Sequence, residues 1–173
     1  MDETQRDAPI GDEEAQKQLE SLAQILLKRN WKATAAESCT AGMVSAKLTR
    51  LPGSSAWFDM GISVYSNEAK ARLLAVGQDI LSQYGAVSEQ TAIAMCRGVM
   101  GMAKADLAVS VTGVAGPSGG APGKPVGTVW FAAGTRRGVF AKKKVFPGDR
   151  DAVREAAARF AVAMLLEAAQ RGE

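Results

Sequence analysis

Apolar residues recur along this chain at two spacings, one typical of helices and one typical of strands. Leu19, Leu22 and Leu26 fall on one face of a helix, so residues 12–30 are predicted to form an amphipathic helix with acidic residues at its start. Further helices are expected at residues 40–50, 67–75, 88–104 and 151–170.

Short runs rich in Val, Ile and Ala lie between these helices and predict the strands of a sheet. Residues 106–111 alternate little, which is typical of a central strand buried on both faces. Residues 61–65 are likewise expected to form a buried strand. The remaining strands are expected at residues 32–36, 126–133 and 139–146, the last two paired as a hairpin. This order of elements predicts an α/β fold in which helices cover both faces of a mixed sheet.

The length and composition are those of one globular domain. A chain of 173 residues, 47% hydrophobic and 23% charged, is long enough to bury one core. Residues 12–173 are assigned to this domain, and the polar, acidic residues 1–11 are expected to be a disordered tail rather than a signal peptide. No apolar run is long enough to predict a membrane-spanning helix.

Charge and cysteine content narrow the expected partners. The formal net charge is only +3, and basic residues cluster only at 136–137 and 142–144. A solvated hairpin face accounts for these clusters better than contact with nucleic acid does. Two cysteines without a repeated spacing predict no disulfide framework and a cytoplasmic location.

Candidate chemistry centres on a strand-to-helix turn in a chain that contains no histidine. Ser38 lies between the strand at 32–36 and the helix at 40–50, where backbone N–H groups suit an anion or a developing oxyanion. Without histidine, a serine nucleophile cannot belong to a Ser-His-Asp triad, and a lysine with a lowered pKa is the remaining common base. Two alternatives stay open: Ser38 or Thr40 is merely the helix N-cap, or Cys39 is the nucleophile.

Lys70 is the candidate base. It follows the strand predicted at 61–65, and Tyr65 lies at the end of that strand. Sites in α/β proteins form where strands end near helix N-termini, and partial burial there would lower the pKa of Lys70 enough for it to take a proton from Ser38. Tyr65 would relay or orient that proton. The alternative is that Lys70 is an ordinary solvated surface residue.

Two further segments are candidates for anion binding. Thr112 and Gly113 begin a glycine-rich stretch that resembles a phosphate cradle, although the Gly-Lys-Ser/Thr pattern of a P-loop is missing. Arg150 lies just before the last predicted helix, where its guanidinium would clamp a phosphate or carboxylate. The competing interpretations are a flexible surface loop and a surface ion pair of Arg150 with Asp149 or Asp151.

Seven motifs follow one another along about residues 15–170. They are AESCTAG (36–42), LPGSSAWF (51–58), YSNEAK (65–70), YGAVS (84–88), TGVAGP (112–117), KPVGTVW (124–130) and GDR (148–150). Together they resemble the CinA carboxy-terminal domain family of nicotinamide-nucleotide amidohydrolases. The resemblance implies a three-layer α/β/α domain that hydrolyses the carboxamide of nicotinamide mononucleotide to nicotinate mononucleotide and ammonia, in pyridine nucleotide recycling.

The resemblance also implies roles for single residues. The family's serine–lysine pair corresponds to Ser38 and Lys70, with Tyr65 close by. The substrate is expected to contact Glu37, Cys39, Thr40, Gly42, Asn67, Thr112, Gly113 and Arg150. Backbone N–H groups near Cys39 and Thr40 would hold the oxyanion, while helix N-terminal N–H groups, the glycine-rich turn and Arg150 would bind the phosphate. No metal or organic cofactor is expected.

The chain departs from the family pattern at Ala41-Gly42, where the family usually has Gly-Gly. The extra methyl group is expected to crowd the backbone near the site, although alanine suits a helix better than glycine does. Larger family members carry an N-terminal domain that resembles molybdopterin-binding proteins, and we expect this chain to be a stand-alone amidohydrolase. The expected partner is a small mononucleotide, without nucleic acid or membrane, and the expected assembly is a homo-oligomer. The alternative function is a non-catalytic nucleotide-binding module or partner domain.

Overall fold

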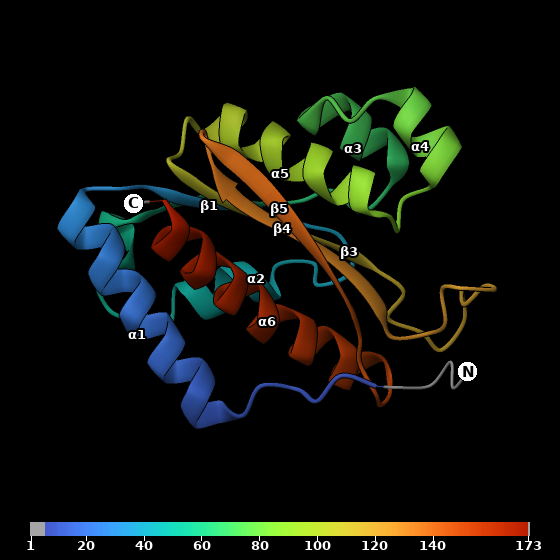
Figure 1. Ribbon diagram of the computed structural model, residues 1–173, viewed down its shortest axis with the longest axis horizontal. Helices are drawn as coiled ribbons and strands as arrows, with labels where there is room; N and C mark the ends of the chain where they lie inside the picture. Colours follow the sequence, from blue (N-terminus) through green and yellow to red (C-terminus); the bar gives the residue numbers. More distant parts are fainter. Residues whose placement is uncertain (1–5, 173) are drawn as a thin grey trace.

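The structure is a computed structural model that describes residues 6–172. A five-stranded sheet forms its centre, in the order β2-β1-β3-β4-β5 (Figure 1). The strands are β1 (Ala33–Glu37), β2 (Phe58–Ser63), β3 (Leu107–Gly113), β4 (Thr128–Thr135) and β5 (Gly138–Val145). β1 pairs in parallel with β2 and β3, whereas β4 is antiparallel to β3 and β5. The sheet is therefore mixed, as predicted, and β3 is its central strand.

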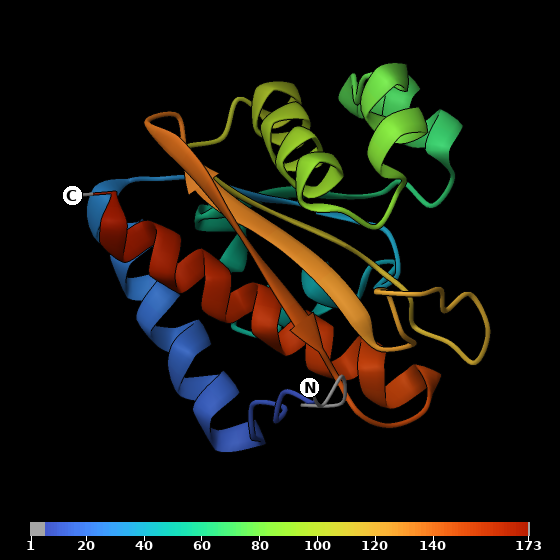
Figure 2. The ribbon, with the colours of Figure 1, turned by 45° about the vertical axis from the view of Figure 1, so that its right-hand side comes forward.

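Helices cover both faces of this sheet (Figures 1 and 2). One layer contains α1 (Asp12–Arg29), α2 (Met43–Leu48) and α6 (Arg150–Arg171), and the other contains α3 (Asn67–Leu74), α4 (Gln78–Tyr84) and α5 (Glu89–Ala103). A 3₁₀ turn at Ser54–Ala56 precedes β2. The expected three-layer α/β/α arrangement is confirmed. No helix within residues 6–172 is long and apolar enough to cross a membrane.

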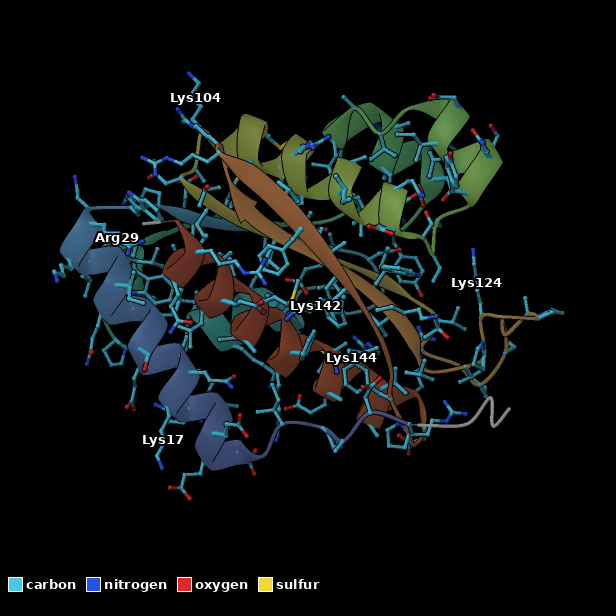
Figure 3. The ribbon with its side chains drawn as sticks, in the orientation of Figure 1. Lys17, Arg29, Lys104, Lys124, Lys142 and Lys144 are labelled. Carbon is cyan, nitrogen blue, oxygen red and sulfur yellow. The ribbon has the colours of Figure 1, made fainter. Side chains whose placement is uncertain are left out.

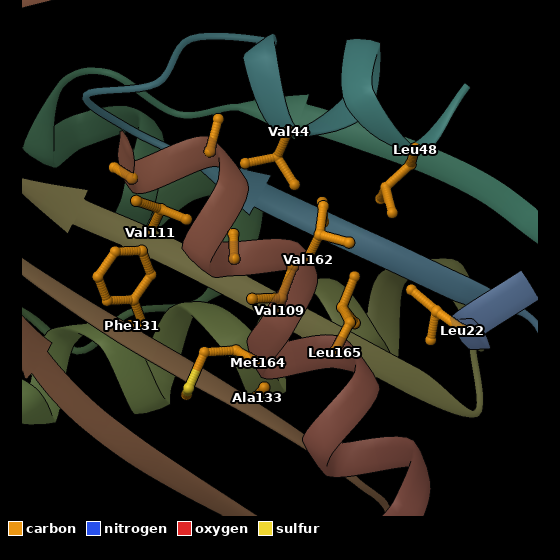
Figure 4. Packing of buried hydrophobic residues seen from close by; sticks show 14 of the residues in the cluster. Leu22, Val44, Leu48, Val109, Val111, Phe131, Ala133, Val162, Met164 and Leu165 are labelled. Carbon is orange, nitrogen blue, oxygen red and sulfur yellow. The ribbon is translucent and has the colours of Figure 1, made fainter. Parts of the chain in front are cut away.

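Each helical layer packs its own hydrophobic core against the sheet, because successive side chains of a strand point to opposite faces. Val109 and Val111 of β3 and Phe131 of β4 join the core beneath α1, α2 and α6 (Figure 4). Ala108 and Ala132, from the same two strands, join the smaller core beneath α3, α4 and α5. Burial on both faces explains why β3 has an almost continuous apolar sequence.

Two of the three lysines of β5 are held in ion pairs. Lys142 Nζ lies 2.6 Å from a carboxylate oxygen of Glu167 on α6, and Lys144 Nζ lies 2.8 Å from Asp7 (Figure 3). The other carboxylate oxygen of Asp7 accepts the Val145 N–H at 2.7 Å, and the Asp7 N–H donates to the Val145 carbonyl at 2.8 Å. Asp7 therefore covers one end of the β5 edge, while residues 1–5 of the predicted tail lie outside the described residues.

Two elements, helix α4 and strand β2, differ from the prediction. Helix α4 is not predicted by the sequence pattern, because Leu81 is the one buried residue in its seven. The strand expected at 61–65 spans Phe58–Ser63 and is an edge strand, not a buried one, with half-buried and exposed residues alternating along it. An edge strand has a neighbour on one side only, and its successive side chains point to opposite faces of the sheet, which gives the alternation of exposure along β2. Tyr65 consequently lies beyond the end of β2.

The turn between β1 and α2 places two consecutive residues in the left-handed region. Ala41 has a φ of 46° and Gly42 a φ of 101°, and the helix expected from residue 40 begins only at Met43. Ala41 therefore lies before the helix, so the helical preference of alanine does not apply to it. A residue with a Cβ atom costs about 1–2 kcal/mol in this conformation, which is a physical reason for glycine at this position.

We expect Ala41→Gly to stabilise the protein. The relief of left-handed strain, about 1–2 kcal/mol, exceeds the extra chain entropy that glycine gives the unfolded state, about 0.4–1 kcal/mol. The free energy of unfolding in urea should rise by about 0.5–1 kcal/mol. The matched control is Ala46→Gly, at an exposed position inside α2, which should lower it by about 0.5–1 kcal/mol. Equal destabilisation by both substitutions would contradict the strain argument.

Candidate active site

The candidate site lies where the two central parallel strands end. Glu37 of β1 is paired with Val111 of β3, and the N–H of Ser38 donates to the Val111 carbonyl at 2.9 Å. Ser38 therefore leaves the sheet beside Thr112 and Gly113, at the carboxyl edge where ligand sites of α/β sheets form.

Lys70 reaches Ser38 from the first turn of α3. Ser66 caps this helix by accepting the Ala69 N–H at 3.0 Å, which places Lys70 one turn further along. Its Nζ lies 3.0 Å from Ser38 Oγ, 3.0 Å from the Val64 carbonyl oxygen and 3.1 Å from the Tyr65 carbonyl oxygen. The structure thus brings the predicted serine and lysine into hydrogen-bond contact.

The surroundings of Lys70 favour its uncharged form. The side chain is only 1% exposed, and burial lowers its pKa from the ordinary value of 10.5, an effect that negative charge on Cys39 would oppose. Within residues 6–172, no carboxylate forms an ion pair with Lys70 that would hold its proton. The interpretation of Lys70 as a solvated surface lysine is therefore wrong.

Cys39 is a poor candidate for the nucleophile. Burial raises the pKa of its thiol to about 12, although Arg154 and Lys70 act in the opposite direction. Near neutral pH the thiol stays protonated, and the reactive species of a cysteine is the thiolate. Ser38 is the better-placed nucleophile because it is the group that contacts a base.

The carboxylate of Glu37 organises the turn that follows Ser38. It is buried and accepts hydrogen bonds from the N–H groups of Gly42, Val44 and Ser45 at 2.9, 3.0 and 2.9 Å and from the Ser45 hydroxyl at 2.8 Å. The first N–H groups of α2 are thus already occupied, and the expectation that they bind the substrate phosphate is corrected. Glu37 and Gly42 lie outside the cavity that Ser38 lines.

Two backbone N–H groups beside Ser38 are not used by other residues. The N–H groups of Cys39 and Thr40 donate to no other residue within residues 6–172, and the Cys39 N–H contacts only the sulfur of its own thiol. The side chain of Thr40 is buried, and its hydroxyl oxygen also lacks a described partner. Thr40 as a whole is 0% exposed and does not line the cavity of Ser38, so the expectation that it contacts the substrate is corrected.

A cavity of about 280 Å³ opens in front of the Ser38–Lys70 pair. The predicted residues Cys39, Tyr65, Thr112, Gly113 and Arg150 line it, and Asn67, which is exposed, does not. Ser118 and Gly119, from the glycine-rich stretch predicted to bind an anion, also line it, whereas the wall formed by Ala86 and Val87 was not predicted as part of the site. The Thr112 hydroxyl donates to the Ala86 carbonyl at 2.8 Å, and this bond links the start of the glycine-rich stretch to the wall of Ala86 and Val87. Hollows of about 310 and 590 Å³ flank the β4–β5 turn, but their lining contains no nucleophile–base pair.

Arg150 presents a positive charge at the mouth of this cavity. Its two terminal nitrogens donate to the Gly116 carbonyl at 2.8 Å and to the Tyr65 hydroxyl at 3.0 Å. The alternative of an ion pair is not supported, because Asp149 caps the Ala152 N–H and Asp151 lies 3.6 Å from Arg154. The hydroxyl of Tyr65 thus bonds Arg150, whereas its backbone carbonyl contacts Lys70.

Arg154 is a further residue at the site that sequence reasoning did not single out. It lies one turn beyond Arg150 on α6, and its Nε donates to the Cys39 carbonyl at 3.0 Å. An arginine on a helix carries no local signal of such a contact, because Cys39 is 115 positions away in the sequence.

The fold is that of a known family. The CinA C-terminal domain family matches residues 15–169, and the chain belongs to that family. It is 48% identical over 155 residues to a nicotinamide-nucleotide amidohydrolase PncC of Escherichia coli K12, covering 89% of this chain and 94% of the relative. A protein of the same name from Pseudomonas putida is 50% identical over 133 residues, which cover 77% of this chain and 83% of the relative.

Solved structures agree with the fold. A crystal structure of the competence damage-inducible protein A from Klebsiella pneumoniae MGH 78578 superposes with a TM-score of 0.87 at 38% identity, over 92% of this chain and 99% of that one. The competence/damage inducible protein CihA from Agrobacterium tumefaciens gives a TM-score of 0.86 at 37% identity, over 93% and 98% of the two chains.

Proposed function

We propose that this chain hydrolyses the carboxamide of nicotinamide mononucleotide, giving nicotinate mononucleotide and ammonia, with Ser38 as nucleophile and Lys70 as base. The observation that carries the proposal is the 3.0 Å contact between Lys70 Nζ and Ser38 Oγ at a buried position that faces a cavity. The substrate follows from the relatives at 48–51% identity that are named nicotinamide-nucleotide amidohydrolase. The absence of histidine leaves lysine as the base within reach.

The hydrogen bonds of Lys70 suit both protonation states that this role requires. A neutral amine has two N–H donors and one lone pair. When the carbonyls of Val64 and Tyr65 take the two donors, the lone pair is left toward the Ser38 hydroxyl. After proton transfer, the ammonium has three donors for the same three oxygens. The protein therefore needs no rearrangement around Lys70 during the proton transfer.

The reaction follows as an acyl transfer in two halves. Lys70 takes the hydroxyl proton as Ser38 Oγ bonds to the carboxamide carbon, and the N–H group of Cys39, which lines the cavity, stabilises the oxyanion. The carbon–nitrogen bond breaks as Lys70 returns the proton, and ammonia leaves. Water, deprotonated by Lys70, then attacks the ester, the proton on Lys70 returns to Ser38, and the carboxylic acid leaves and gives its proton to the solvent.

The substrate phosphate is assigned to the part of the cavity lined by Arg150 and the glycine-rich turn after β3. A guanidinium without a carboxylate partner among residues 6–172 keeps its charge available, and bonds from guanidinium to phosphate are among the stronger hydrogen bonds of proteins. The phosphate is not assigned to the start of α2, because the N–H groups there already donate to the Glu37 carboxylate.

We further infer a role in pyridine nucleotide recycling, assembly as a homo-oligomer, and a cytoplasmic location, the last supported by two free cysteines.

We expect Ser38→Ala to abolish ammonia release from nicotinamide mononucleotide, because no acyl-enzyme can form. Nucleotide binding, measured by calorimetry, should be largely retained. The control is Cys39→Ala, which removes the neighbouring thiol and should keep turnover. Near wild-type turnover in Ser38→Ala would overturn the mechanism, and binding without turnover in the wild type would favour a non-catalytic module.

Activity should rise with pH through an apparent pKa below the ordinary lysine value of 10.5, because burial lowers the pKa of Lys70. The base is neutral and active above this pKa, and protonated and inactive below it. Steady-state rates across pH test the expectation. Lys70→Ala should be nearly inactive and should lose this rise of activity with pH. Lys70→Arg should not restore activity, since guanidinium stays charged. An active Lys70→Arg variant would show that the side chain acts only as a positive charge.

Arg150→Ala should raise KM for nicotinamide mononucleotide about ten- to a hundredfold, which corresponds to the loss of about 1.5–3 kcal/mol from a charge-assisted hydrogen bond. The comparison substrate is nicotinamide riboside, which lacks the phosphate and should be affected far less. Equal losses on the two substrates would mean that Arg150 supports the structure rather than the phosphate.

A further inference from the structure

We propose that the protein has a second ligand site, a basic hollow between the C-terminal end of α5 and the β4–β5 turn, and that this hollow binds a nucleoside diphosphate or triphosphate. The proposal does not depend on acyl transfer at Ser38. The basic hollow has a volume of about 590 Å³, within the range typical of small-molecule sites. Four cationic side chains line it: Arg97 of α5, Lys104 at its C-cap, and Arg136 and Arg137 of the turn.

The charge of the basic hollow is not balanced by the protein, because no carboxylate lines it. Arg136 Nη2 donates to the Lys104 carbonyl at 3.2 Å and so caps the end of α5. The side chains of Arg97, Lys104 and Arg137 form no hydrogen bond or ion pair within residues 6–172. Asp106 shares a smaller hollow of about 110 Å³ with both arginines of the turn but does not line this one. Charges of one sign in a concave site attract a ligand of the opposite sign.

The shape of the basic hollow leaves room for a ligand between the cations. Arg97, Gly101 and Lys104 are four and three residues apart, so they lie on one face of α5. Gly101 has no side chain, and a Cβ atom there would meet nothing within 4 Å. The hollow is therefore open between Arg97 and Lys104. Figure 3 shows Lys104 beside the β4–β5 turn, whose two arginines line the other side.

This arrangement suits a chain of phosphates better than a single phosphate. Guanidinium groups bind phosphate oxygens through paired N–H donors, and two or three linked phosphates carry enough charge and length to contact cations on both sides. Met100, which is 7% exposed, and the half-buried Val139 add apolar surface to the lining, on which a nucleobase can rest. A nucleic acid strand would instead need a positive surface that follows its backbone.

The basic hollow is separate from the cavity of Ser38. Central strand β3 runs from one to the other: Leu107 at its start is paired with Thr135, which lines the hollow, and Gly113 at its end lines the cavity. Seven residues of extended chain span about 20 Å. A nucleotide in the hollow therefore leaves the position assigned to the substrate phosphate free.

The test compares Gly101→Glu with Gly101→Gln, two side chains of nearly the same shape that differ in charge. Both fit because a Cβ atom at this position meets nothing within 4 Å, and both suit a helix better than glycine does. The glutamate carboxylate would lie between Arg97 and Lys104, where it repels phosphate. With ATP as the probe in calorimetry, we expect Gly101→Glu to bind about tenfold or more weakly than Gly101→Gln.

A second pair of variants tests the cations themselves. Arg97→Gln combined with Arg137→Gln should weaken ATP binding about tenfold, since one exposed ion pair changes affinity by up to about fivefold. The matched control combines Arg72→Gln with Lys143→Gln, which removes the same charge from two exposed residues outside the hollow. Its affinity should stay within about twofold of wild type. Thermal unfolding followed by circular dichroism checks that every variant is folded.

Two further comparisons identify the site and the ligand class. Arg150→Ala removes the cation of the Ser38 cavity and should leave ATP affinity within about twofold of wild type. AMP, which has a single phosphate, should bind the wild type about tenfold or more weakly than ATP, because it contacts fewer of the cations.

Each outcome decides the proposal. Absence of saturable ATP binding by the wild type would overturn it, and so would equal affinities of Gly101→Glu and Gly101→Gln. If Gly101→Glu fails to fold, wild-type affinity in the combined Arg97 and Arg137 variant would overturn it instead. Binding that is lost in Arg150→Ala would place ATP in the cavity of Ser38. AMP affinity equal to that of ATP, or tighter binding of a short single-stranded oligonucleotide, would refute the ligand class.

Discussion

The burial of an unpaired lysine is the constraint on which the site depends. An isolated ammonium is costly to bury, and such a group lowers its pKa and loses its proton instead. Lys70 is held by oxygens that suit both charge states, namely two carbonyls and the Ser38 hydroxyl. Those carbonyls belong to Val64 and Tyr65, in the link between β2 and α3. The backbone of this segment therefore fixes the position of the Lys70 amine, which lies next to the Ser38 hydroxyl whose proton it would take.

A second constraint is the turn after Ser38, which is held by two charges of opposite sign. Glu37 gathers the N–H groups at the start of α2, and Arg154 gathers the carbonyls of Cys39 and Thr40. A helix of six residues has little stability of its own, so α2 relies on the carboxylate and on packing of its apolar side chains. The N–H groups of Cys39 and Thr40 donate to no other described residue, and of the two residues Cys39 lines the cavity. The fold thus keeps one donor, the Cys39 N–H, beside Ser38 where the proposed chemistry needs it.

Sequence reasoning predicted the features that have strong local signals. The long helices follow from apolar periodicity, and the central strand follows from its continuous apolar run. The absence of histidine removed the commoner base and made Lys70 a candidate, and the resemblance to the family assigned Ser38 and Lys70 as the pair. Helix α4 was missed because one buried leucine, Leu81, gives no periodicity. The cavity wall of Ala86 and Val87 and the contact of Arg154 with the Cys39 carbonyl were missed for another reason, since contacts between distant segments depend on how the layers pack.

The segment Gly148-Asp149-Arg150 illustrates how a short motif gains meaning from its backbone. Gly148 has a φ of 101°, and a Cβ atom there would lie 2.7 Å from the Cβ of Ala152, so a side chain would be both strained and crowded. This tight turn places Asp149 where its carboxylate accepts the Ala152 N–H at 2.9 Å and starts α6. Arg150 is then the first residue of a helix whose start is fixed, and Arg154 follows one turn later. Gly148 and Asp149 thus fix where α6 begins. This start places Arg150 at the cavity and Arg154 at the turn that follows Ser38.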